Sequence, residues 1–202
     1  MDLKPLPREF YEASALEVAP RLLGRWLLRR TRLGLAGGPI VEVEAYLEND
    51  PACHAFAGKT ERNRTMWGPP GHGYVYLIYG MHYCFNAVCL PSGRAEAVLI
   101  RAIEPALNPG VMNQLRPGAV AAGVSNGPAK LCQALEIARE LDGVDLCRAD
   151  SDAFIAGPPD LSRFLAERGP VAATPRVGIS VAVDQPWRFV LARSRFLSRK
   201  AR

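Results

Sequence analysis

The chain has 202 residues, of which 49% are hydrophobic and 22% are charged, and its formal net charge is +5. This composition is typical of a globular protein and excludes general disorder, and no apolar run is long enough to span a membrane. The N-terminal residues lack the apolar core of a signal peptide, so we expect a cytoplasmic protein. The five cysteines form no CxxC pair, which argues against a disulfide framework or a zinc site.

The first half of the chain predicts mostly strands behind one helix. Ser14 and Glu17 form a capping box, which predicts a helix over 14–23 with a kink or break at Pro20. We then expect a strand over 25–31, a turn over 34–38, a strand over 40–46 and a long loop over 47–72. Strands over 74–79 and 82–90 form a hairpin around Gly80, and a further strand covers 97–103.

The second half predicts helices followed by strands. Helices are expected over 110–115 and 128–141, and strands over 176–183 and 187–192. This order lacks a βαβ repeat and indicates an α+β fold. We expect one compact domain over 1–202, with a curved, mostly antiparallel sheet, flanking helices and a protruding β-hairpin.

Basic residues are concentrated at the end of the chain. No acidic residue follows Asp184, whereas six basic residues do: Arg188, Arg193, Arg195, Arg199, Lys200 and Arg202. Arginine outnumbers lysine 21 to 4, and a guanidinium group matches phosphate oxygens well, which favours an anionic partner such as nucleic acid. A GC-rich genome and a solubilising tail would give the same bias, so both explanations stay open.

The segment 41–46 alternates apolar and polar residues with a period of two. Glu42, Glu44 and Tyr46 therefore share one face of the expected strand. Two carboxylates on a strand face are commonly solvated. A carboxylate beside an aromatic ring can instead have a raised pKa and act as a general base.

Aromatic residues are concentrated in the expected hairpin. Tyr76 and Tyr79 have opposite parity, and a strand that ends at Gly80 would let Tyr79 project from the tip. Ordinary sheet packing is the alternative for both residues. His54 lies in the long loop, and its distance in sequence from the other two histidines predicts no metal site.

Six ordered segments give the sequence a resemblance to the alkyladenine (3-methyladenine) DNA glycosylases, the monofunctional purine-excising enzymes of base excision repair. These segments are 41–46, 62–66, 74–86, 99–105, 126–135 and 173–178. The resemblance as a whole covers about residues 9–198. The resemblance implies double-stranded DNA with damaged purines as the partner, a monomer at the nucleoid, and neither a cofactor nor a membrane.

The resemblance also implies site residues by position. Glu44 matches the general base that activates a water molecule, and Arg101 matches a residue that holds this water and the nearby backbone. The remaining matches are the base-pocket residues Tyr46, His54, Tyr76 and Asn86, the intercalating Tyr79, and the DNA contacts Arg62, Met66, Lys130 and Arg176. Asn86 would reject guanine through a steric conflict with its exocyclic amine.

Three other functions compete with this one. A bifunctional glycosylase and lyase needs an amine nucleophile, and none of the four lysines lies in an apolar motif suited to that role. A lesion-marking module without catalysis would not require Glu44 and Arg101. A generic basic α+β protein would have no role with nucleic acid.

Overall fold

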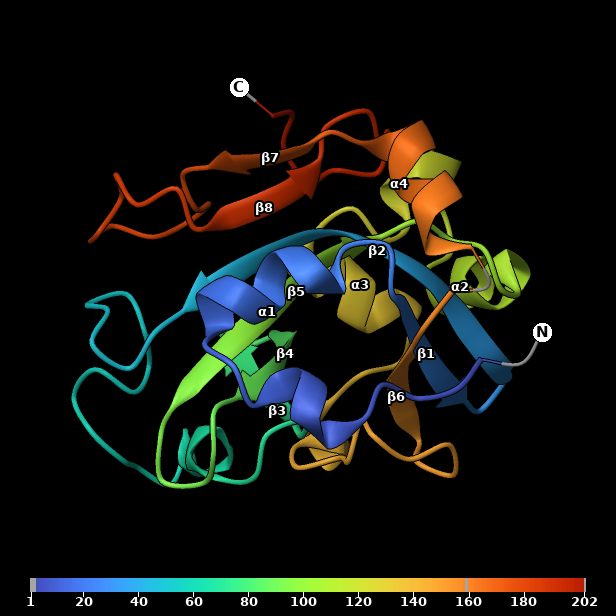
Figure 1. The fold of residues 1–202 in the computed structure, drawn as a ribbon. Coiled ribbons are helices and arrows are strands. Elements are labelled where there is room, and N and C mark those ends of the chain that lie inside the picture. Colours follow the sequence, from blue (N-terminus) through green and yellow to red (C-terminus); the bar gives the residue numbers. More distant parts are fainter. Residues whose placement is uncertain (1–2, 159, 202) are drawn as a thin grey trace.

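The computed structural model describes residues 3–158 and 160–201, which fold around one curled antiparallel sheet (Figure 1). The strands are β1 Trp26–Thr31, β2 Gly34–Tyr46, β3 Gly73–Ile78, β4 His82–Cys89, β5 Glu96–Ile103, β6 Ala153–Ala156, β7 Val171–Thr174 and β8 Arg188–Leu191. The α-helices are α1 Ala15–Leu22, α2 Pro109–Leu115, α3 Pro128–Ala134 and α4 Leu161–Arg168. Short 3-10 turns cover Arg8–Tyr11, Arg64–Trp67, Ala121–Gly123 and Arg139–Leu141.

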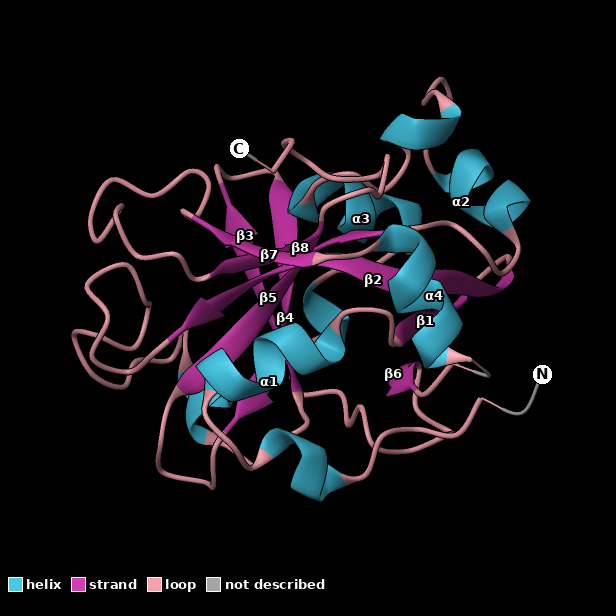
Figure 2. Cartoon of the chain, turned by 45° about the horizontal axis from the view of Figure 1, so that its top comes forward, coloured by secondary structure: helices cyan, strands magenta, loops and turns pink. Residues whose placement is uncertain are grey.

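The long strand β2 organises the sheet. The main path runs β3-β4-β5-β2-β1-β6, and β8 pairs with both β2 and β7. All of these pairs are antiparallel. Helices flank the sheet, as the second view shows (Figure 2). The expected α+β class, the antiparallel sheet and the β3–β4 hairpin are therefore confirmed.

The glycines before residue 40 belong to a strand rather than to a turn. A Cβ atom at Gly37 would lie 2.0 Å from the carbonyl oxygen of Leu27, and one at Gly38 would lie 1.9 Å from that of Glu104. Glycine is needed here because neighbouring backbones approach β2 closely. The turn predicted over 34–38 was wrong, and the chain reverses between β1 and β2 instead.

Several other boundaries differ from those predicted. The helix α1 is not broken at Pro20 and ends at Leu22, with Leu23 as its C-cap. The helix predicted over 128–141 ends at Ala134, and Glu136 soon follows with a positive φ of 50°. Residues 176–183 form no strand, and β6, β7 and α4 were not predicted.

The sheet separates an apolar core from a polar face. Val41, Val43 and Ala45 of β2 are buried in the main core, together with alternate residues of β4 and β5 and the apolar face of α1. The intervening residues of the same strands point to the other side, because successive side chains alternate across a strand. The loop over 47–72 and the segment after β7 cover this second face.

The second face buries a network of charges around Glu42, which has no solvent exposure. Its Oε1 accepts hydrogen bonds from Nε of Arg101 and Nε of Arg188, each at 2.8 Å, and Ser198 donates to both carboxylate oxygens at 2.6 Å. Burial alone would raise the pKa of Glu42, but Arg101, Arg188 and Ser198 outweigh it and hold the pKa below its ordinary value. The network ties the C-terminal segment to β2.

Replacing Glu42 should destabilise the fold strongly. Glu42→Ala leaves two buried guanidinium groups without their shared carboxylate, a loss of about 3–5 kcal/mol in the free energy of unfolding. Urea denaturation of the variant beside the parent protein measures this loss. Glu61→Ala, which removes an exposed carboxylate paired with Arg64, is the control and should change stability by less than about 1 kcal/mol. Equal effects of the two substitutions would contradict the structural role of Glu42.

The same network predicts how stability depends on pH. Because the folded-state pKa of Glu42 is depressed, its contribution is fully present above the ordinary glutamate pKa and is lost as the pH falls through the lower folded-state value. Urea midpoints measured through the acid range should therefore fall less steeply for Glu42→Gln than for the parent protein. If the urea midpoints of the two proteins fell with the same slope, the folded-state pKa of Glu42 would not be depressed.

Candidate active site

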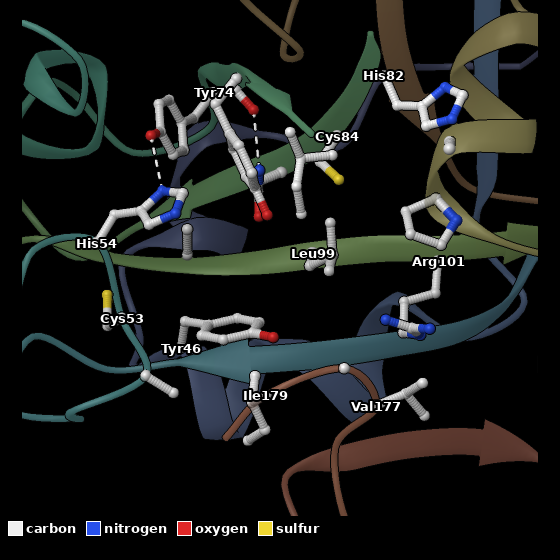
Figure 3. Close-up of a pocket in the computed structure, with 18 of the residues that line it drawn as sticks. Tyr46, Cys53, His54, Tyr74, His82, Cys84, Leu99, Arg101, Val177 and Ile179 are labelled. Carbon is white, nitrogen blue, oxygen red and sulfur yellow. Dashed lines mark hydrogen bonds between the residues drawn. The ribbon is translucent and has the colours of Figure 1, made fainter. Parts of the chain in front are cut away.

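A cavity of about 380 Å³ opens on the polar face of the sheet. Figure 3 shows its lining side chains, which come from β2, β3, β4 and β5, from the loop after β2, and from the segments around Pro128 and Val177. The cavity brings together seven of the residues predicted from sequence: Tyr46, His54, Met66, Tyr76, Tyr79, Asn86 and Arg101.

Glu44 does not itself line this cavity; it is fully buried and forms hydrogen bonds with three residues that do. Its Oε1 accepts a hydrogen bond of 2.7 Å from the backbone N–H of Val177. Its Oε2 accepts from the Tyr46 hydroxyl at 3.0 Å and from Nη1 of Arg101 at 3.1 Å. These donors fix the orientation of the carboxylate, and Oε1 keeps one lone pair that no described protein donor occupies.

Arg101 joins the two buried carboxylates of β2. Its Nε donates to Glu42 at 2.8 Å, while Nη1 reaches Glu44 and Nη2 donates to Oγ of Ser198 at 3.2 Å. Burial would lower the pKa of Arg101, but the two carboxylates outweigh it and raise the pKa above its ordinary value. A permanent positive charge therefore lines the cavity beside Glu44.

Aromatic rings form the other end of the cavity. The ring centroids of His54 and Tyr76 are 4.4 Å apart in an edge-to-face arrangement, and those of Tyr74 and Tyr76 are 5.4 Å apart. Burial raises the pKa of Tyr46 and of Tyr76, so both phenols stay neutral. Burial and then the charge of Arg62 lower the pKa of His54, which is therefore neutral at pH 7. This wall is a surface on which a flat ring can stack.

Asn86 is held rigidly within the cavity wall. The residue is 4% exposed, and its Nδ2 donates a hydrogen bond of 3.0 Å to the main-chain oxygen of Tyr74 on the adjacent strand. A fixed amide of this kind can reject a ligand group that does not fit beside it.

Tyr79 projects from the tip of the β3–β4 hairpin and is 79% exposed. Its φ of 53° lies in the left-handed region that bulky residues rarely adopt, and Gly80 follows with a φ of 70°. Together these two residues reverse the chain and direct an aromatic side chain outward at the mouth of the cavity.

Two of the predicted DNA contacts, Arg62 and Met66, differ in their exposure to solvent. Arg62 is exposed, and its guanidinium donates to the main-chain oxygen of Leu77 at 3.1 Å and lies 5.7 Å from the centre of the Tyr76 ring. Met66 is only 2% exposed and packs among buried residues of the cavity wall. Met66 therefore lies in the cavity wall rather than on the exposed surface, and its contact with DNA stays a prediction.

The two predicted phosphate contacts also differ in exposure. Lys130 is exposed and donates to Oδ1 of Asn126 at 2.9 Å. Arg176 is buried, pairs with the buried Asp50, and donates to the main-chain oxygen of Ala45 at 3.1 Å. We therefore no longer propose Arg176 as a phosphate contact, because its charge is already neutralised inside the protein.

The basic C-terminal segment is likewise not one uniform surface. Arg188 is 2% exposed and belongs to the Glu42 network, so it is neither a solubilising residue nor a free cation. Arg193, Arg195, Arg199 and Lys200 lie on the described part of the segment, whereas Arg202 lies outside the described residues.

Three groups that shape the site were not predicted from the sequence. Tyr74 lies in the hairpin segment 74–86, yet nothing in the sequence indicated its hydrogen bond with His54. The backbone N–H of Val177 has no sequence signal, and nothing in the sequence of the basic tail indicated a role for Ser198.

Residues 3–158 and 160–201 contain no group of three or more His, Cys, Asp or Glu residues that could hold a metal ion. None of the helices in these residues has the length and apolar character that a membrane span requires.

Comparison with known proteins matches this chain to one family over nearly its whole length. The family model described as methylpurine-DNA glycosylase matches residues 9–195. A relative from Carboxydothermus hydrogenoformans is 47% identical over 195 residues, which cover 96% of this chain and 99% of the relative. A relative from Agrobacterium fabrum is 46% identical over 195 residues, covering 96% and 93%. A relative from Rhizobium meliloti is 48% identical over 192 residues, covering 95% of each.

All three relatives are designated as 3-methyladenine DNA glycosylases. The matched region includes the strands that carry Glu44, Arg101 and Asn86, and the hairpin turn that carries Tyr79. The chain therefore belongs to the methylpurine-DNA glycosylase family and is a hydrolase of DNA repair.

Proposed function

We propose that this chain excises 3-methyladenine and other damaged purines from duplex DNA, using a water molecule that Glu44 activates. The observation that carries the proposal is the combination of a buried Glu44–Arg101 pair with an aromatic cavity and an exposed tyrosine at its mouth. The relatives designated as 3-methyladenine DNA glycosylases support the choice of base.

A base inside a duplex must leave the stack before its glycosidic bond can be reached. Tyr79 is suited to fill the gap that remains, because an apolar wedge between base steps offsets part of the lost stacking. The neutral rings of Tyr46, His54 and Tyr76 can then hold the extruded base. Aromatic stacking contributes about 1–3 kcal/mol per base and is stronger for an electron-poor, alkylated purine through cation–π attraction.

Glu44 can perform two tasks in the hydrolysis. Its carboxylate accepts a proton from water as the water oxygen attacks the anomeric carbon, and the bond to the purine nitrogen breaks with its electron pair going to the base. The sugar passes through an oxocarbenium-like state, whose positive charge the carboxylate offsets. Arg101 and the Val177 N–H hold the carboxylate in place, so that it need not reorganise during the reaction.

The arrangement favours hydrolysis without a lyase step. A lyase needs an amine that attacks the anomeric carbon to form a Schiff base. None of the four lysines lies among the residues that line the cavity. We therefore propose that strand breaks appear only when alkali cleaves the abasic product.

Glu44→Gln tests the proposed base. The variant should bind lesion-containing DNA but excise damaged purines about 10²–10⁴-fold more slowly, because an amide cannot accept the proton. Single-turnover release of 3-methyladenine, hypoxanthine and undamaged adenine from labelled duplexes measures the rate. Glu61→Gln, on the protein surface, is the control and should keep the parent rate.

Either of two results would change the proposal. Retained turnover in a folded Glu44→Gln variant would remove Glu44 as the base. If the parent protein bound damaged duplex without releasing any base, a lesion-marking module would become the better description.

Tyr79→Ser tests the hairpin wedge. Loss of the ring should weaken binding to a lesion-containing duplex about tenfold or more, while binding to undamaged duplex changes little, because the ring acts only where a base has left the stack. Equilibrium binding to both duplexes measures this difference. Val120→Ser removes another exposed apolar side chain, 76% exposed, and is the control. Equal losses for the two duplexes would contradict the role of Tyr79.

A further inference from the structure

Tyr74 contacts two residues of the base pocket through two different groups. Its hydroxyl lies 3.0 Å from Nδ1 of His54, and its main-chain oxygen accepts the 3.0 Å hydrogen bond from Nδ2 of Asn86 (Figure 3). Tyr74 of β3 and Asn86 of β4 are also direct partners in the register of the hairpin. One residue therefore links the pocket wall on the loop to the pocket wall on the sheet.

The direction of the Tyr74–His54 hydrogen bond follows from the surroundings. Tyr74 is 1% exposed, and its hydroxyl has no other hydrogen-bond partner among the described residues. If Nδ1 donated to the phenol oxygen, the phenol hydrogen would remain buried and unpaired, which is unfavourable. The phenol therefore donates to Nδ1. The neutral His54 ring must then carry its own hydrogen on Nε2.

The main chain at His54 is held independently. Asn63 is 1% exposed, and its Nδ2 donates to the carbonyl oxygen of His54 at 2.8 Å and to that of Gly58 at 2.9 Å. The loop backbone is thus anchored by Asn63. The His54 ring packs edge-on against Tyr76, and its hydrogen bond among the described residues is with Tyr74. No described residue forms a hydrogen bond with Nε2, which belongs to a side chain that lines the cavity.

We infer that Tyr74 is a positioning residue for base recognition, which holds the His54 ring in the tautomer that presents an Nε2–H donor to the pocket. The inference rests on the proposed function for its biological meaning, but the tautomer itself does not. A fixed N–H donor favours a ligand with an acceptor within its reach and disfavours one that places a second donor there. Rotation of the ring or exchange of its proton would remove this distinction.

Nitrogen NMR of the uniformly labelled full-length protein tests the tautomer directly. At pH 7.5, two-bond proton–nitrogen correlations of His54, assigned by their loss in His54→Gln, should show Nδ1 without hydrogen and Nε2 with hydrogen. In Tyr74→Phe, the two nitrogen shifts should move toward averaged values, because both tautomers become accessible. A hydrogen on Nδ1 in the parent protein, or unchanged shifts in Tyr74→Phe, would overturn the inference.

A matched control is available elsewhere in the core. Tyr11 is also fully buried, and its hydroxyl has no hydrogen-bond partner among the described residues. Tyr11→Phe therefore removes the same atom without breaking a hydrogen bond. It should leave both the His54 signals and the excision rate unchanged.

A double-mutant cycle tests the functional consequence. Under single-turnover conditions with a hypoxanthine duplex, Tyr74→Phe should lower the excision rate about three- to tenfold, the loss expected for one hydrogen bond. In a His54→Ala background the same substitution should cause no further loss. Rejection of guanine should persist in Tyr74→Phe, since the main-chain oxygen that holds Asn86 is unchanged. Equal losses in both backgrounds would overturn the positioning role.

The two experiments separate the inference from the proposed function. If the parent protein released no base from any duplex, the proposed glycosylase mechanism would fail. The NMR result would still decide whether Tyr74 sets the tautomer of His54.

Discussion

The structure depends on burying two carboxylates on one face of a single strand. Glu42 and Glu44 are fully enclosed, and Arg101 bridges them while Arg188 neutralises Glu42 from β8. Charges of this kind cannot be left unpaired away from water. The requirement brings the C-terminal segment onto β2, and the segment in turn supplies Ser198 to Glu42 and the Val177 N–H to Glu44.

This arrangement gives the two sides of the sheet different tasks. The apolar residues of β2, β4 and β5 form a close-packed core that keeps the strands from moving. The alternate residues of the same strands line much of the cavity, so these side chains stand on rigid elements. The hairpin tip carries Tyr79, which is 79% exposed and lies at the mouth of the cavity.

The cavity combines a charged end with a neutral aromatic end. Arg101 lines the first and is hydrogen-bonded to the buried carboxylate of Glu44. Tyr46, His54 and Tyr76 occupy the second, and burial keeps their rings uncharged at neutral pH. Tyr74 connects the aromatic end to the sheet, so that the ring of His54 and the amide of Asn86 are oriented by one buried residue.

The sequence by itself determined the α+β class, the β3–β4 hairpin and the shared face of Glu42, Glu44 and Tyr46, because these follow from alternation along single segments. Only the tertiary structure decided that this face is buried, because its partners Val177, Arg188 and Ser198 lie more than a hundred residues away along the chain. For the same reason the sequence could not distinguish Arg176, which forms a buried ion pair with Asp50, from an exposed arginine that could bind phosphate. Local patterns report local geometry, whereas the neutralisation of a charge depends on which distant residue folds against it.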